Sequence, residues 1–156
     1  MLATPHILAG AAVATATGNV PLGIVSAYAS HYILDMVPHV DIGVFHDKDD
    51  ENWQLSKQEI ALAAAEIILG TVILIYLVWG KKFVTLALVG GFFGLLPDLL
   101  DNVPWWQNYF RHASWYAPFN FLHQKLQLRL ESNKWYWGIP FQLIIIGGAI
   151  WFLLKF

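Results

Sequence analysis

Residues 30–41 read Ser-His-Tyr-Ile-Leu-Asp-Met-Val-Pro-His-Val-Asp, which places two histidines and two aspartates at the end of an otherwise apolar helix. His31 and Asp35 are four residues apart, so on a helix they lie one turn apart on the same face. An imidazole and a carboxylate placed in this way can bind one divalent cation. The proline ends the helix, and His39 and Asp41 follow it. Solvated polar residues at a helix end would give the same pattern, so the rest of the chain must decide between the two interpretations.

The composition indicates a membrane protein. The chain of 156 residues is 57% hydrophobic and 13% charged, whereas soluble domains carry about 25% charged residues. Its eight Trp, six Tyr and ten Phe suit a membrane–water interface. We therefore expect one all-α, integral membrane helical bundle over residues 1–156. The net charge of −2 gives no basic surface for nucleic acid, and without cysteine any metal must be bound by His, Asp and Glu.

About five membrane helices are expected from the apolar segments and their end signals. They run over residues 4–17, 21–37, 57–79, 83–96 and 138–154, with Thr4 as the cap of the first helix and a Ser56–Glu59 capping box at the third. Residues 105–137 are rich in aromatic side chains and predict an interfacial segment with a short amphipathic helix in the headgroup layer.

A weak internal repeat divides the first four helices into two hairpins, residues 4–41 and 58–104. Residues 6–10 resemble residues 66–70, and residues 34–38 resemble residues 100–104. Each hairpin thus has a possible metal ligand early in its first helix and an aspartate at the end of its second. Because the helices alternate in direction, these polar residues gather on one side of the membrane.

Ionisable side chains at membrane depth are costly unless they are paired or bound to a metal, which favours a metal site on that side. The candidate metal ligands are His6, His31, Asp35, His39, Glu66, Asp98, Asp101 and His123. One group would use His6, His31 and Asp35, and another Glu66, Asp98 and Asp101, with His123 closing over both. Asp98 and Asp41 are the candidate catalytic general bases.

At these residues the chain resembles the small bacterial inner-membrane metal-dependent hydrolases. The resemblance is carried by His6 and Gly10 in a helix of small residues, by Pro97-Asp98 at a helix end, and by the Ser-His-x-x-Leu-Asp pattern of residues 30–35. That family looks related to zinc-dependent phospholipase C, an all-helical fold that holds zinc through His, Asp and Glu. The chain departs from the family in the early position of the Ser-His-x-x-Leu-Asp element and in lacking a His-Arg-Gly-x-Thr-His-Ser stretch.

These observations lead to the hypothesis of a membrane-bound hydrolase with one to three divalent ions, Zn²⁺ being favoured. The substrate would be the phosphoester of a membrane lipid or a lipid-linked phosphate, cleaved at the membrane surface by a metal-activated water. An ion-binding or transporter-type protein built on the hairpin repeat is the alternative, although such sites lie near the bilayer midplane. A third hypothesis is a structural or partner-binding subunit, in which the polar residues are only solvated. The excess of Lys and Arg on the site side predicts a cytoplasmic site in the bacterial inner membrane.

Overall fold

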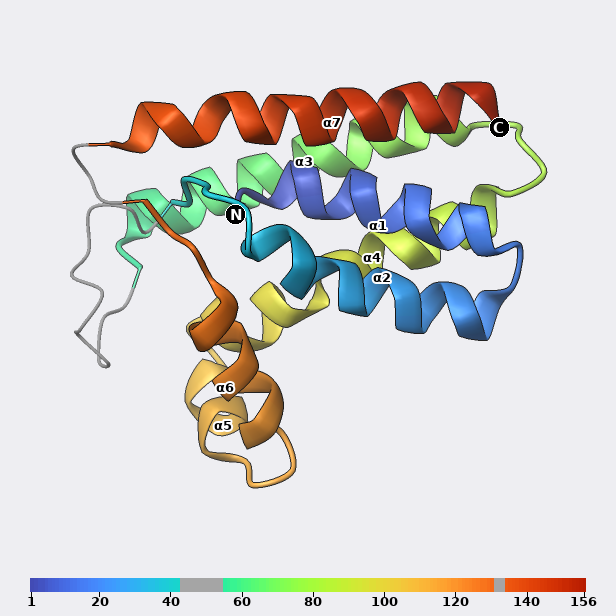
Figure 1. The fold of residues 1–156 in the computed structure, drawn as a ribbon. Coiled ribbons are helices and arrows are strands. Elements are labelled where there is room, and N and C mark those ends of the chain that lie inside the picture. The colour runs from blue at the N-terminus through green and yellow to red at the C-terminus, as the bar shows by residue number, and fades with distance from the viewer. Residues whose placement is uncertain (43–54, 131–133) are drawn as a thin grey trace.

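The computed structural model describes residues 1–42, 55–130 and 134–156, and these residues form helices joined by short turns (Figure 1). The elements are α1 (Ala3–Thr17), α2 (Val20–Asp35), α3 (Lys57–Val78), α4 (Val84–Asn102), α5 (Gln107–His112), α6 (Ala117–Leu126), a 3₁₀ helix η1 (Trp135–Trp137) and α7 (Gly138–Lys155). Within the described ranges the pairing of extended backbone is limited to one isolated bridge between His39 and Arg129. The expected all-α class is confirmed.

Three helices, α3, α4 and α7, are long and apolar enough to cross a membrane. Helices α1 and α2 have 15 and 16 residues, short of the roughly 20 that a span needs. The structure therefore supports a membrane protein, with three of the five expected spans.

The helices alternate in direction as the sequence predicts. The α1–α2 and α3–α4 turns lie at one end of the bundle (Figure 1), and each turn contains a glycine with positive φ, 61° at Gly18 and 74° at Gly80. The opposite end, which we call the site end, holds the starts of α1, α3 and α7 and the ends of α2 and α4. Residues far apart in sequence thus meet there.

Helix α1 is the central helix of the bundle, in contact with α2, α3, α4 and α7. It meets α4 backbone to backbone: a Cβ atom on Gly10 would lie 2.5 Å from the Gly90 carbonyl oxygen, and one on Gly94 would lie 2.5 Å from the His6 carbonyl oxygen. Glycine allows this close approach between membrane helices. The contact holds His6 beside the last turns of α4.

Helix α4 does not end near Leu96, as expected, but continues through Pro97 to Asn102. A proline inside a helix lacks an N–H donor, so Pro97 leaves the carbonyl oxygen of Phe93, four residues earlier, without its helical partner. In the same turn, α4 is tied to a neighbouring helix. The carbonyl oxygen of Gly94 accepts a hydrogen bond from His31 Nδ1 at 2.8 Å. Asp98 and Asp101 are therefore positioned by a helix and not by a loop.

Two smaller differences concern the helix ends and the aromatic segment. Helix α1 begins at Ala3 without a side-chain cap, so Thr4 does not cap it. The expected Ser56–Glu59 capping box is present. The aromatic segment contains two short helices, α5 and α6, which project from the bundle (Figure 1). Trp105 and Trp115 are 80% and 60% exposed there.

Candidate metal centre

The carboxylate of Asp35, at the last residue of α2, is the centre of a buried cluster of histidines. Its oxygens lie near the Nε2 atoms of four imidazole rings, at 3.2 Å from His6, 3.2 Å from His123, 3.4 Å from His31 and 3.7 Å from His39. Asp35, His6, His31 and His39 are fully buried, and His123 is nearly so. Residues from α1, α2, the segment after α2 and α6 thus share one site.

Three of the four rings are held through their other nitrogen. His31 Nδ1 lies 2.8 Å from the Gly94 carbonyl oxygen, and His39 Nδ1 lies 2.8 Å from the Val37 carbonyl oxygen. His123 Nδ1 lies 2.5 Å from Asp101 Oδ2. These oxygens can only accept, so Nδ1 of each ring carries a proton, and Nε2 is the nitrogen left to face a ligand. The three Nε2 atoms that face Asp35 are therefore oriented as metal ligands usually are.

Asp98, one turn before the end of α4, faces the same cluster. Its carboxylate oxygens lie 3.5 Å from His123 Nε2, 3.8 Å from His31 Nε2 and 3.9 Å from His6 Nε2. The ligand atoms of His6, His31 and Asp98 lie within 4.8 Å of one another, as do those of His31, Asp35 and His123. Ligand atoms around a tetrahedral zinc are about 3.3 Å apart, so small side-chain shifts would close either group on an ion.

Several buried atoms of this cluster make no hydrogen bond within the described part of the chain. They are both ring nitrogens of His6, His39 Nε2, Asp35 Oδ2 and Asp101 Oδ1. Buried polar atoms are normally satisfied, because an unpaired one is costly. The rings of His6 and His31 are also stacked, with centroids 3.9 Å apart, which suits neutral imidazoles better than two charged ones. Nitrogen and oxygen donors in this arrangement fit a divalent metal such as zinc.

His39 and His123 are the two histidines of the cluster that lie outside the transmembrane helices, and their electrostatic surroundings are opposite. Burial lowers the pKa of His39 to about 3, so its ring is neutral at pH 7. Burial also opposes a charged His123, but its hydrogen bond to Asp101 and the nearby carboxylates of Asp35 and Asp98 outweigh this and raise the pKa of His123 to about 10. A proton and a metal ion compete for the same Nε2 lone pair, so a metal bound at His123 would release a proton.

The remaining predicted site residues lie at the edge of the cluster or outside it. Glu66 of α3 accepts hydrogen bonds from the Thr4 backbone N–H at 3.3 Å and the Thr4 hydroxyl at 3.0 Å. It therefore satisfies the start of α1, where backbone N–H groups lack partners, and the structure does not bring it to Asp35. Asp101 contacts the cluster through His123. The sequence predicts two separate ligand groups. The structure brings the ligands together in one group around Asp35, and Glu66 lies apart from this group.

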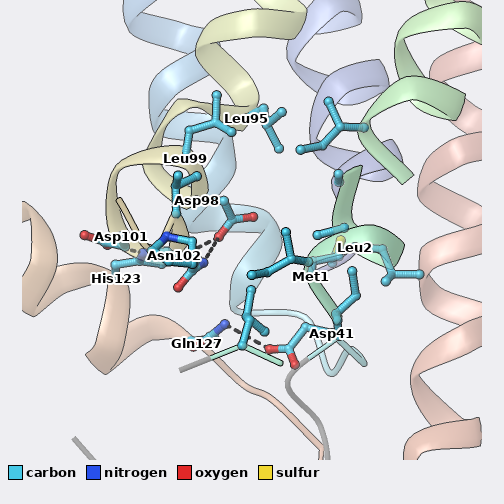
Figure 2. A pocket seen from close by; sticks show the side chains of 18 of the residues that line it. Met1, Leu2, Asp41, Leu95, Asp98, Leu99, Asp101, Asn102, His123 and Gln127 are labelled. Atoms are coloured by element: carbon cyan, nitrogen blue, oxygen red, sulfur yellow. Dashed lines mark hydrogen bonds and ion pairs between the residues drawn. The ribbon is translucent and has the colours of Figure 1, made fainter. Parts of the chain in front are cut away.

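A cavity of about 670 Å³ opens beside the cluster. Asp98, Asp101, His123 and Asp41 all line it, and Figure 2 shows the Asp98 side chain between Leu95 and Asn102 at its wall. Asn102 donates a hydrogen bond to Asp98 at 3.1 Å. The cluster is thus reached from the cavity through Asp98, whose side chain is 17% exposed.

Asp41 lies across the cavity from Asp98 (Figure 2). It accepts a hydrogen bond from Gln127 at 3.3 Å and forms an ion pair with Arg129 at 3.9 Å. Burial raises the pKa of the Asp41 carboxyl, although Arg129 opposes the shift. Both candidate general bases therefore line the same space.

Gln142 is a site-end residue whose contacts the sequence does not reveal. Its side chain accepts a hydrogen bond from the Leu2 N–H at 3.1 Å and donates one to the Val40 carbonyl oxygen at 3.1 Å. It therefore ties α7 to the start of α1 and to the segment that carries His39. A lone glutamine in an apolar helix is the available signal, because polar side chains within membranes usually have partners.

No protein-family model, curated protein or solved structure gives a significant match to this chain. The resemblance to the inner-membrane hydrolases stays a prediction that rests on its short motifs.

Proposed function

We propose that this chain is a membrane-bound, metal-dependent hydrolase that cleaves a phosphoester of a lipid at the membrane surface. The proposal is carried by one observation, the convergence of four imidazole Nε2 atoms on the buried Asp35 carboxylate. Three of these rings are held through Nδ1 by an oxygen atom, which leaves their Nε2 atoms facing the carboxylate. The cavity beside Asp98 gives a substrate access to the cluster.

The metal ligands would be His6, His31, His123 and Asp35, with His39 completing the set beside Asp35 Oδ1. Asp98 is also a candidate ligand, but we assign it to proton transfer because it is the more exposed of the two carboxylates. A bound divalent metal would lower the pKa of a water toward about 7 and polarise a phosphoryl oxygen. Asp101 orients His123 through Nδ1 and strengthens it as a ligand. Glu66 is not part of this ligand set.

The general base is assigned to Asp98, because it lies at the wall of the cavity and within 4 Å of three histidines. Its carboxylate would accept the proton of the attacking water, while Asn102 holds its Oδ1 atom. Asp41 is the second candidate and would act from across the cavity.

The setting of the site supports a surface hydrolase over a transporter. The cluster lies at the site end of the bundle, where α2 and α4 end and α1, α3 and α7 begin, whereas transporter sites lie near the midplane. We further propose that α1 and α2 also span the membrane, with local thinning of the bilayer around them, and that the site end faces the cytoplasm of a bacterial inner membrane.

Elemental analysis of protein purified without chelator tests the metal. We expect stoichiometric zinc or another divalent metal, and hydrolysis of the soluble phosphodiester bis(p-nitrophenyl) phosphate. His31→Ala and Asp35→Asn should each lower metal affinity and hydrolysis by about 10-fold to 100-fold or more, since each removes a ligand.

His112→Ala is the matched control for metal binding, because His112 is exposed and its Nδ1 lies 2.7 Å from the Asn108 carbonyl oxygen of its own helix. It should keep the metal; because His112 lines the cavity, hydrolysis is not compared in this variant. Protein that folds without stoichiometric metal, or that retains full hydrolysis after His31→Ala, would contradict the proposal.

A further inference from the structure

The cavity beside Asp98 has an apolar half that the metal centre does not use. Four residues of α3, spaced as one helix face, line it: Ile60, Ala63, Ala64 and Ile67. Leu95 and Leu99 of α4, four residues apart, line the other side. We call this apolar half the α3–α4 trench. Ala63 and Ala64, the middle two of the four α3 residues, have small side chains and leave space in the trench that larger side chains would fill.

The trench continues directly into the polar half of the cavity. Leu95 and Leu99 flank Asp98 on α4, and Figure 2 shows all three side by side at the cavity wall. Arg111 of α5 also lines the cavity and makes no hydrogen bond or ion pair to another described residue, although it is attracted to Asp101. A guanidinium beside a metal centre suits an anionic group such as phosphate.

One wall of the trench is formed by α3, whose opposite face is exposed toward lipid. Helix α3 is a candidate span, and its large residues off the trench face, Leu62, Ile68, Leu69 and Val72, are 52–63% exposed. A hydrocarbon chain in the bilayer can therefore lie along α3 at the depth of the trench. Its polar end would then be at the site end, beside Asp98 and Arg111.

We propose that the α3–α4 trench binds one hydrocarbon chain of the substrate, a lipid whose phosphate group lies beside Asp98, and that Ala63 and Ala64 determine whether the chain fits. The inference rests on the proposed hydrolase function for the position of the phosphate. It adds a specificity device: a chain that fits the trench gains close packing contacts with α3 and α4 and holds the phosphate beside Asp98.

Photolabelling tests chain binding without requiring turnover. The probe is dodecyl phosphate with a diazirine at the end of its chain, added to the protein in detergent. We expect its label on Ile60, Ala63, Ala64 and Ile67, and competition by unlabelled dodecyl phosphate but not by dodecanol. Label spread over Leu62, Ile68, Leu69 and Val72, as general lipid contact would give, would overturn the proposal.

Substitutions test the role of the alanines. Ala64→Phe should remove the trench label and lower kcat/KM for a dodecyl p-nitrophenyl phosphodiester about tenfold or more, because the phenyl ring fills the space that the chain would occupy. Hydrolysis of bis(p-nitrophenyl) phosphate, which has no chain, should not change. Ala65→Phe is the control, since Ala65 is exposed and does not line the cavity. Ala63→Leu provides a second variant if Ala64→Phe does not fold.

The two assays separate this inference from the proposed function. Specific trench labelling without any phosphoester hydrolysis would contradict the hydrolase and leave the chain site standing. Equal loss of hydrolysis on both substrates in Ala64→Phe, or no loss on either, would contradict the trench and leave the hydrolase standing.

Discussion

At the scale of residues, the His123 side chain contacts one aspartate from each of the two hairpins. Its Nε2 lies 3.2 Å from Asp35 and its Nδ1 lies 2.5 Å from Asp101, and these aspartates occupy matching positions in the two repeat units. Asp35 lies at the candidate metal centre, and Asp101 orients the ring of His123. Equivalent residues in the repeat therefore have different physical roles.

Asp101→Asn tests the orienting role. The amide oxygen of asparagine can still accept the hydrogen bond from His123 Nδ1, but it lacks the negative charge that makes the imidazole a stronger ligand. We expect metal affinity, measured by competition with a chromogenic chelator, to fall about 10-fold to 100-fold, with His112→Ala unchanged. An affinity equal to that of the wild type would show that Asp101 serves packing alone.

Sequence spacing predicts some contacts of the cluster and not others. His31 and Asp35 are one helical turn apart, so their approach follows from the backbone geometry alone. Glu66 was expected at the cluster because it aligns with His6 in the repeat. The position of a helix relative to its neighbour is not contained in that alignment, and the unsatisfied N–H groups at the start of α1 bind Glu66 instead.

At the scale of elements, the contact between α1 and α4 fixes the site more than any other. His6 lies one turn before Gly10 on α1, and Asp98 lies one turn after Gly94 on α4, so the depth of the backbone contact sets the distance between their side chains. Hydrophobic patterning predicts that both segments are helices. It does not predict which faces meet, because lipid and helix neighbours are equally apolar.

Gly94→Ala tests this contact, because the new Cβ would lie 2.5 Å from the His6 carbonyl oxygen. We expect a destabilisation of about 1–3 kcal/mol, as in other overpacked interiors, together with weaker metal binding. The measurement is thermal unfolding in detergent, with and without chelator.

Gly147→Ala is the matched control in α7, since a Cβ there meets nothing within 4 Å. It should leave stability unchanged or raise it by up to about 1 kcal/mol through helix propensity. Equal effects of the two substitutions would contradict a special role for the α1–α4 contact.

At the scale of the whole molecule, alternation of the helices explains why every predicted ligand lies at one end. This could be predicted from the sequence, because it depends only on counting apolar segments and their turns. The extent of α4 beyond Pro97 could not be predicted, because a proline in a sequence usually indicates a helix end and the tertiary contacts of this turn, such as that between the Gly94 carbonyl group and His31, come from another helix.

The absence of cysteine from the chain allows the sidedness to be measured with single substitutions. In intact bacterial cells, Lys82→Cys should react with a membrane-impermeant maleimide, and Lys125→Cys should react only after lysis, if the site end faces the cytoplasm. Ala16→Cys, in the exposed last turn of α1, should behave as Lys82→Cys if α1 and α2 also span. The reverse pattern at Lys82 and Lys125 would invert the orientation, and protection of Ala16→Cys would remove the two short spans.

The central position of α1 has a consequence for how the protein is made. Helix α1 is synthesised before α4 and α7, and these two neighbours come from the second half of the chain. Until they are made, His6 can pair only with His31 and Asp35 of its own hairpin, and the face of α1 that carries Gly10 lacks the helix against which it packs. We therefore expect the N-terminal hairpin to reach its final packing only after α4 and α7 are in place, and a metal site that includes Asp98 would be completed after that step.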